Sequence, residues 1–395
     1  MTGEGNAYSR RGRGCGSILG WLLVVVLLGV LGWLVAVSGL PFWLAHNVVV
    51  PSAVRQVALD FGSQAATSAR SVLPLGDRLA HDAETRGSHP HIVPTAGKTV
   101  HAKAIAFSFG GDKYTITPHV ASDVYWGARN STRLLVQPPG ESDAEWTRTY
   151  YHAFADDPAQ ASAINDVCAQ LRAIRRKTGL DSDQYLELIA KYVQSIPYDW
   201  KMYASGTGKQ RFPVETLVDG KGLCGDKSVL LADLLAHEGY SAALLDFRPE
   251  KHMAVAVAGP GETYRRTGLL FLETTSPCYV TDVPTEYTGG MRLSSEPTVI
   301  VIGSGTARYT AADQIARIIR TRDMAGTAAE QLYQTAKQES LTQDQAREVN
   351  RKLDLAYYAA TSLRSNVVDE SGKSVGKFMD RTQAVRWIDR NAWWL

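Results

Sequence analysis

The segment from Arg211 to Tyr240 constrains the fold more than any other part of the chain. Its turn-rich first part runs from Val218 to Gly222 and leads directly to Cys224. Apolar residues then recur at helical spacing as far as Leu235. Gly239 follows where a helix-terminating glycine is expected. The pattern therefore predicts a helix that begins at Cys224 and ends just before Gly239.

A cysteine at the start of a helix is a candidate nucleophile. The first N–H groups of a helix have no intrahelical partner, and together with the helix dipole they favour an anion such as a thiolate. Cys224 occupies this position. The alternative is that Cys224 is a small apolar residue buried at a helix start, as most single cysteines are.

Two later stretches predict strands that carry a base and an acid. Residues 250–258 alternate Met or Val with His or Ala, which indicates a strand with His252 at the head of its small-residue face. Those small residues leave room for a helix to pack closely. Residues 269–275 indicate a second strand that carries Glu273. In a hairpin, His252 and Glu273 then share a face, directly opposite or one diagonal apart.

These residues form a candidate catalytic triad. Cys224, His252 and Glu273 follow one another as nucleophile, base and the group that orients the base. The sequence PVETLVDGKGLCGDKSVLLADLLAHEGY, followed by HMAVAV and FLETT, resembles the transglutaminase-like superfamily, and most closely its membrane-anchored prokaryotic members. The resemblance covers residues 185–302, with a weaker similarity at FSFGGDKYTI. It implies an α+β fold with a papain-like core, with Cys224 as nucleophile, His252 as base and Glu273 at the place where many relatives carry aspartate.

The resemblance also has a departure and further implications. Relatives often carry acids on both sides of the cysteine, whereas this chain has Leu223 and Gly225 there. Papain-like enzymes use a side-chain donor that precedes the nucleophile, which implies Gln194 as an oxyanion donor. The alternative is a solvent-facing Gln194. Tyr198 and Trp200 are expected to line the cleft or the core.

The N-terminal region predicts a membrane anchor. No Asp, Glu, Lys or Arg occurs between Gly14 and Val54, and residues 18–37 are apolar and long enough to cross a bilayer as a helix. Arginines precede this stretch, so the short tail is expected in the cytoplasm and the rest of the chain outside the membrane. The alternative is a cleaved signal peptide, since small residues occur at 36–38.

The remaining patterns divide the chain into modules. The hairpin signal around Gly110 predicts a small β region, with a further strand at 134–136. Two helices are expected before the cysteine, at 159–178 and from Asp181 to Pro197, and three after residue 302. The expected organisation is a basic tail (1–16), a transmembrane helix (17–38), a linker or helical segment (39–100), a small β region (101–155), a catalytic domain (156–303) and a C-terminal helical region (304–395).

Composition excludes some classes of function. The chain has 42 basic and 40 acidic residues, so it has no large basic field for nucleic acid. No cofactor or metal is expected, because the four cysteines have no zinc spacing and His81, His89 and His91 have no acidic or cysteine partner at ligand spacing. A disulfide between Cys168 and Cys278 is the less favoured alternative to two free thiols.

The sequence thus predicts an extracytoplasmic thiol enzyme that acts on amide bonds of a protein or peptide substrate through a thioester. Hydrolysis is favoured over amine transfer, because water is in large excess outside the membrane. The alternative is a catalytically inactive domain of this fold that binds peptides or the cell envelope.

Overall fold

The computed structural model describes residues 89–338, 340–363, 367–368, 374–375 and 379–395. All of them belong to one compact unit, Arg86–Leu395. The expected tail, transmembrane helix and most of the linker lie outside the described residues, as does Cys15. Among the helices of the described part, none is long and apolar enough to cross a membrane. The described chain is a mixed α and β structure with antiparallel sheets.

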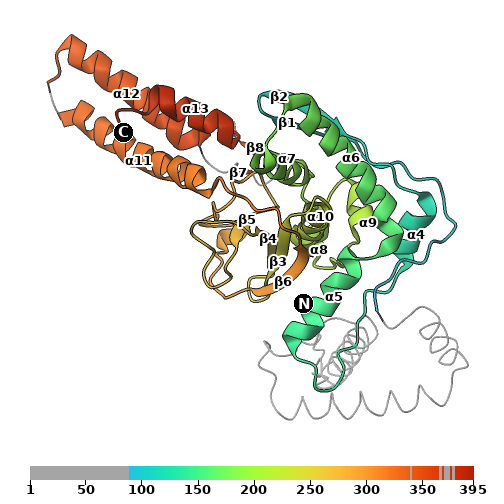
Figure 1. The fold of residues 1–395 in the computed structure, drawn as a ribbon. Helices are drawn as coiled ribbons and strands as arrows, with labels where there is room; N and C mark the ends of the chain where they lie inside the picture. The colour runs from blue at the N-terminus through green and yellow to red at the C-terminus, as the bar shows by residue number, and fades with distance from the viewer. Residues whose placement is uncertain (1–88, 339, 364–366, 369–373, 376–378) are drawn as a thin grey trace, which may run out of the picture. The chain divides into compact units, whose positions relative to one another are not determined.

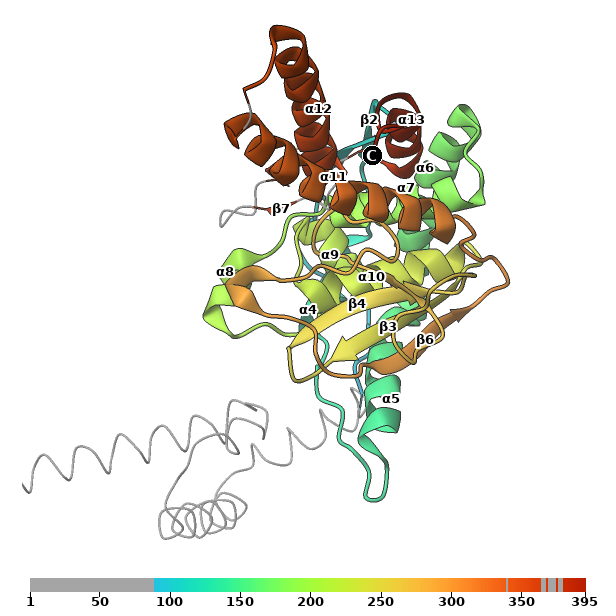
Figure 2. The ribbon, with the colours of Figure 1, turned by 90° about the vertical axis from the view of Figure 1, so that its left-hand side faces the viewer.

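A four-stranded antiparallel sheet in the order β5-β4-β3-β6 forms the centre of the unit. The strands are β3 (Ser241–Phe247), β4 (His252–Val257), β5 (Leu270–Leu272) and β6 (Thr298–Ser304). Nearly every residue of β3 and all of β4 are buried, because both faces of the sheet are covered. Helix α10 (Cys224–His237) packs on one face and lies between the sheet and helices α6 and α7 (Figures 1 and 2).

The two faces of the sheet carry different side chains, and this corrects one expectation. Met253, Val255 and Val257 belong to the same apolar cluster as the leucines of α10. Ala254 and Ala256 belong to a second cluster on the opposite face, with Phe271 and Phe247. The helix therefore packs on the bulky face of β4, and aromatic side chains rather than a helix fill the space beside the small residues.

Helices surround α10 on its other sides. The predicted helices before the cysteine are confirmed: Gly179 ends the first in a left-handed conformation, and Asp181 caps the second through the backbone N–H of Gln184. The helices of this layer are α4 (Ser122–Asn130), α5 (Asp143–Ala155), the 3-10 turn Pro158–Gln160, α6 (Ala161–Thr178), α7 (Ser182–Gln194), α8 (Trp200–Ser205) and α9 (Pro213–Asp219).

The expected β region is smaller than predicted. Strands β1 (Ile105–Phe109) and β2 (Asp112–Ile116) form the predicted hairpin, with Gly110 and Gly111 at positive φ in its turn. Residues 134–136 form no strand. Much of the remaining 101–155 segment is helical, in α4 and α5, because Ser142 and Glu145 form a capping box that starts α5.

Three helices follow the sheet, as the sequence predicts. They are α11 (Ala312–Gln338), α12 (Gln343–Ser362) and α13 (Arg381–Asn391), and α11 packs against both of the others. The last helix begins at Arg381 rather than near residue 375, where the short strand β8 (Ser374–Val375) pairs with β7 (Val367–Val368). A 3-10 turn, Thr288–Gly290, lies between β5 and β6.

Candidate active site

Helix α10 begins at Cys224, as predicted, and its first turn is held by an acid. Asp226 accepts hydrogen bonds from the backbone N–H groups of Leu223 (2.9 Å) and Arg211 (2.8 Å). A carboxylate near a helix N-terminus is favoured by the free N–H groups and by the dipole. This contact fixes the backbone on either side of Cys224, which itself is half-buried.

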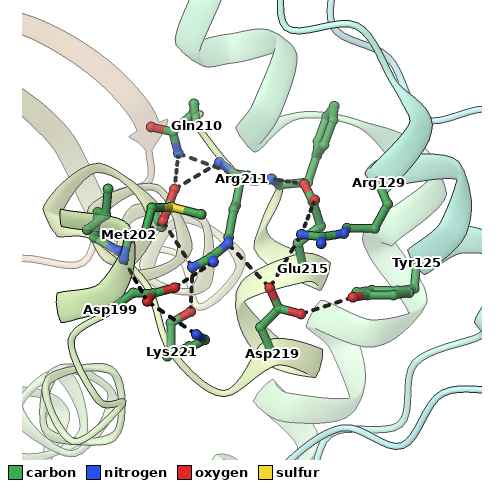
Figure 3. A network of polar contacts seen from close by, with 12 residues as sticks. Tyr125, Arg129, Asp199, Met202, Gln210, Arg211, Glu215, Asp219 and Lys221 are labelled. Atoms are coloured by element: carbon green, nitrogen blue, oxygen red, sulfur yellow. Dashed lines mark hydrogen bonds and ion pairs between the residues drawn. The ribbon is translucent and has the colours of Figure 1, made fainter. Parts of the chain in front are cut away.

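A buried polar network supports the loop that precedes the cysteine (Figure 3). The guanidinium of Arg211 pairs with Asp199 (2.7 Å) and Asp219 (3.3 Å) and also reaches Asp226 (3.5 Å). Lys221 adds a second cation beside Asp199, at 3.2 Å. Because buried charges are stable only when paired and hydrogen-bonded, this network holds the segment from Asp199 to Lys221 in one arrangement.

Lys227, in the same helical turn, is fully buried, and within the part of the chain that the structure describes its ammonium binds carbonyl oxygens rather than a carboxylate. Its ammonium donates to the carbonyl oxygens of Gln194 (3.2 Å), Ile196 (2.8 Å) and Thr275 (3.2 Å). Burial lowers the pKa of Lys227 to about 7, although the charges of Glu273 and Cys224 act in the opposite direction. Lys227 thus ties the end of α7 and the segment after β5 to the nucleophile helix.

His252 and Glu273 meet, as predicted, but the second strand is shorter than expected. Strand β5 ends at Leu272, which pairs with Val255 of β4, so Glu273 directly follows the strand instead of lying within it. The two side chains meet, with His252 Nε2 at 3.1 Å from Glu273 Oε2. Both residues are buried, Glu273 completely.

Glu273 is held by donors on both of its oxygens. Oε1 accepts from the N–H groups of Thr274 and Thr275 and from the hydroxyl of Thr275, at 2.8–2.9 Å, and Oε2 also accepts from Tyr287 at 2.7 Å. Burial alone raises the pKa of Glu273, but the charge of His252 and these hydrogen bonds outweigh it and lower the pKa to about 2. Glu273 is therefore a carboxylate at neutral pH. Sequence reasoning missed Tyr287, because it lies in an irregular loop with no periodic pattern.

His252 joins the acid to the cysteine. Burial lowers the pKa of His252, but the charge and the hydrogen bond of Glu273, together with the nearby Cys224, raise it to about 10. Since Nε2 faces Glu273, Nδ1 is the ring nitrogen left for Cys224. The imidazole is consequently a cation at neutral pH, and a cationic histidine favours the thiolate of a neighbouring cysteine.

The turn before β4 brings His252 to this position. Lys251 has a positive φ of 54°, which is uncommon for a residue other than glycine. Its carbonyl oxygen lies 3.8 Å from Cys224 Sγ. Left-handed backbone at such a residue costs on the order of 1–3 kcal/mol and is often found at functional sites.

Gln194 is the predicted site residue whose role the structure corrects. Its side-chain amide is buried, and Nε2 donates to the carbonyl oxygens of Glu273 (2.8 Å) and Cys278 (3.2 Å). Its Oε1 accepts from the N–H group of Cys278 (3.3 Å). An amide has only two N–H donors, so neither remains for an oxyanion. Gln194 neither faces solvent nor donates to the cleft, and instead supports the strand end that carries Glu273.

Tyr198 and Trp200 line the cleft, as one of the two alternatives predicted. Cys224 lines the same cleft. Burial raises the pKa of Tyr198, so its hydroxyl keeps its proton at neutral pH. The ring of Tyr198 lies 4.8 Å from that of Trp200 and 6.0 Å from that of Tyr203, centroid to centroid, and the three form an aromatic wall beside the cysteine.

The cleft that contains these residues has a volume of about 1080 Å³. Cys224, His252, Tyr198 and Trp200 lie along it, and its far part is lined by residues of α13. A nucleophile, a cationic histidine, a buried carboxylate and an open cleft are together suited to acyl transfer through a thioester.

The other cysteines and the histidines near residue 90 do not extend this site. Cys168 and Cys278 are both buried and are not joined by a disulfide, the less favoured alternative. Within the described ranges, no group of three or more His, Cys, Asp or Glu residues is arranged to hold a metal ion. His91 instead pairs with Asp157 at 3.2 Å.

Two comparisons with known proteins identified no relative of this chain. No family model matches the chain. A search of curated proteins gave no match either.

Proposed function

We propose that this protein is a thiol enzyme of transglutaminase-like type, with a papain-like core, that hydrolyses amide bonds. The observation that carries the proposal is the arrangement of three residues from separate elements at one cleft. Cys224 begins α10, and its Sγ lies 3.8 Å from the carbonyl oxygen of Lys251, the residue before His252. His252 begins β4 and lines the same cleft, and Glu273 follows β5 and holds His252 at 3.1 Å.

The charge states of His252 and Glu273 support this assignment. A thiolate is the nucleophilic form of cysteine, and an adjacent imidazolium favours it. The raised pKa of His252 supplies that cation at neutral pH, and the low pKa of Glu273 supplies the anion that orients it. The histidine is thus already protonated when the leaving amine needs a proton.

The reaction follows from these states. Cys224 Sγ attacks the carbonyl carbon of the amide, the C–N bond breaks, and His252 gives its proton to the departing amine. Water then attacks the resulting thioester and gives a proton to His252. The C–S bond breaks, a carboxylic acid leaves, and the thiolate and imidazolium return.

The negative oxygen of each tetrahedral intermediate needs hydrogen-bond donors. Because the Gln194 amide is engaged elsewhere, we assign this role to the backbone N–H of Cys224, at the start of α10, and the hydroxyl of Tyr198, which lines the same cleft. Donors at such a position typically contribute 10²- to 10³-fold in rate. Anchoring of this enzyme by residues 17–38 outside the cytoplasm remains part of the proposal, since the N-terminal region lies outside the described residues.

The test uses the full-length protein in detergent with a mixture of synthetic peptides and a tagged alkylamine. Mass spectrometry of the products then separates hydrolysis from amine transfer. We expect cleavage by the wild type and by Cys168→Ala, a matched variant in a buried thiol outside the cleft, and none by Cys224→Ala.

Two outcomes would contradict the proposal. Turnover by Cys224→Ala equal to the wild type would remove the cysteine from the mechanism. Absence of turnover, combined with full complementation in cells by Cys224→Ala but not by Trp200→Ala, would favour a binding module. Products that carry the tagged amine would change the reaction from hydrolysis to transfer.

A further inference from the structure

The cleft continues well beyond the proposed triad. It has a volume of about 1080 Å³, above the roughly 300–1,000 Å³ of sites for small ligands. One part of it is lined by Tyr198, Trp200 and Tyr203, and another by residues of α13. Helices α8 and α13 lie apart in both views (Figures 1 and 2). The cleft is therefore suited to an extended chain rather than to a single small group.

Helix α13 is a fixed wall of this cleft. Arg381 donates to Glu187 of α7 at 2.6 Å, and Asp380 accepts from the N–H group of Gly110 in the β1–β2 turn at 2.9 Å. Tyr279 donates to the carbonyl oxygen of Met379 at 2.6 Å. The start of α13 is thus attached to three separate elements, so its side chains have defined positions relative to the cleft.

Two arginines of this wall face the cleft with no internal partner. Arg386 and Arg390 are one helical turn apart, exposed, and part of the cleft lining. Among the residues that the structure describes, neither forms an ion pair or a hydrogen bond with a side chain. The acid on the same helix, Asp389, pairs with Arg317 at 2.6 Å instead.

The acids that line the cleft are already engaged. Glu250 accepts from the N–H and hydroxyl groups of Ser294 and Ser295 at 2.6–2.9 Å. Glu187 binds Arg381, and Asp380 caps α13 through the N–H of Gln383 at 3.0 Å. The cations available to a ligand in this part of the cleft are therefore not neutralised by the acids around them.

We propose that the α13 wall binds an acidic segment of a peptide substrate, with carboxylates on Arg386 and Arg390 and the target amide at Cys224. This inference rests on the proposed function and names its substrate class. Arginine is the residue best suited to carboxylates, because its planar donors match both oxygens. A peptide fits better than a lipid surface, because the arginines line a concave cleft that also holds the thiol.

The experiment measures binding rather than turnover. Full-length Cys224→Ala protein in detergent is titrated into a fluorescent peptide rich in Asp and Glu, and into its Asn and Gln counterpart, with anisotropy as the readout. The test variant adds Arg386→Gln and Arg390→Gln. The matched control adds Arg347→Gln and Arg351→Gln, two exposed arginines at the same spacing on α12 that do not line the cleft.

We expect the acidic peptide to bind at least about tenfold more tightly than the neutral one, because hydrogen bonds between two charged groups are stronger than those that a neutral amide forms. The α13 substitutions should remove most of that preference, and the α12 substitutions should leave it unchanged. Equal affinities for the two peptides, or an equal loss in the α12 control, would overturn the inference. Stronger displacement by a polyuronate than by unlabelled acidic peptide would assign the wall to an anionic glycan and overturn it as well.

The outcomes distinguish this inference from the proposed function. Selective binding of the acidic peptide by Cys224→Ala protein, with no amide turnover by the wild type, would support peptide binding at the α13 wall and contradict the proposed hydrolysis. Turnover with no preference for acidic peptides would support the proposed hydrolysis and contradict the binding of acidic peptides at the α13 wall.

Discussion

The charged groups of the floor, by which we mean Lys227, His252 and Glu273 buried at or beneath the cleft, differ in their environment from those of the α13 wall. On the floor, Lys227 and Glu273 are buried completely and His252 almost so, and each has defined hydrogen-bond partners. On the wall, Arg386 and Arg390 are exposed and have no ion pair within the described part of the chain. The floor is therefore organised before any ligand arrives, whereas the wall leaves its charges for a ligand.

This difference separates chemistry from recognition. Buried and hydrogen-bonded groups keep shifted pKa values and fixed positions, as an acid or base in catalysis requires. Exposed charges retain ordinary hydration and are screened by salt, so they affect affinity more than the chemical step. Changes on the floor should accordingly have much larger effects than changes on the wall.

The largest effect is expected for His252→Ala. Without the imidazolium, the leaving amine has no acid and the thiolate loses its stabilising cation. We expect a fall in kcat on the order of 10⁵-fold or more, as for the histidine of other triads. The control is His119→Ala, in an exposed histidine, which should retain wild-type kinetics. Turnover by His252→Ala within tenfold of the wild type would show that the floor does not hold the base.

A smaller but still large effect is expected for Glu273→Gln. Oε1 accepts from three donors, so the amide oxygen of glutamine should take that place and the amide nitrogen should face His252. That nitrogen donates to Nε2 and favours the tautomer with its proton on Nδ1, which faces the cysteine. We expect kcat to fall about 10²- to 10⁴-fold.

The comparison for Glu273→Gln is Tyr287→Phe, which removes one donor to the same carboxylate but leaves its charge. Its effect on kcat should be clearly smaller. A loss in Tyr287→Phe equal to that in Glu273→Gln would mean that the charge of the acid is not what matters.

Lys227→Met tests how far the stability of the fold depends on the buried amine of Lys227. The substitution leaves three buried carbonyl oxygens without this donor. We expect the free energy of unfolding to fall by roughly 2–4 kcal/mol, measured by urea denaturation. Lys177→Met, in an exposed lysine at the end of α6, should change it by less than about 0.5 kcal/mol. Equal stabilities of the two variants would contradict a stabilising role for the hydrogen bonds of Lys227.

The pH dependence of stability should also reveal the shifted pKa values of His252 and Lys227. The pKa of His252 is raised from 6.5 to about 10, so its stabilising contribution is full below about pH 6.5 and is lost as the pH rises to about 10. The pKa of Lys227 is lowered from 10.5 to about 7, so the folded protein gains stability as the pH rises from about 7 to 10.5.

The two contributions oppose each other between about pH 7 and pH 10. We expect the stability of Lys227→Met to fall with pH over this range relative to the wild type, and that of His252→Ala to rise, each by on the order of 1 kcal/mol per pH unit. Urea denaturation at stepped pH measures both slopes. If the free energy of unfolding had the same pH dependence in all three proteins, neither group would titrate with the shifted pKa given above.

The smallest effect is expected on the wall, from salt. Raising the ionic strength from about 0.05 M to about 0.5 M should weaken binding of an acidic peptide several-fold, because exposed charges are screened within a few ångströms at high salt. The first-order rate of acylation of bound peptide, from single-turnover kinetics, should stay nearly constant. A salt-sensitive acylation rate with salt-insensitive binding would reverse the roles of floor and wall.

Much of the floor could be predicted from local patterns. The start of α10 at Cys224 follows from a turn, an apolar helical period and a terminating glycine, all within one short segment. The meeting of His252 and Glu273 follows from the period of two in paired strands. Gln194 could not be placed, because its two hydrogen-bond acceptors lie about 80 residues further along the chain.

The sequence by itself determined which elements carry the candidate catalytic residues, because helix and strand periods and caps are set by neighbours along the chain. Tertiary structure alone decided that α10 packs on the bulky face of β4, that Lys227 binds three carbonyls, and that residues of α13 line the cleft. The physical reason is that these contacts join segments far apart in sequence, whose meeting depends on packing and on the hydrogen-bond partners that the whole fold provides.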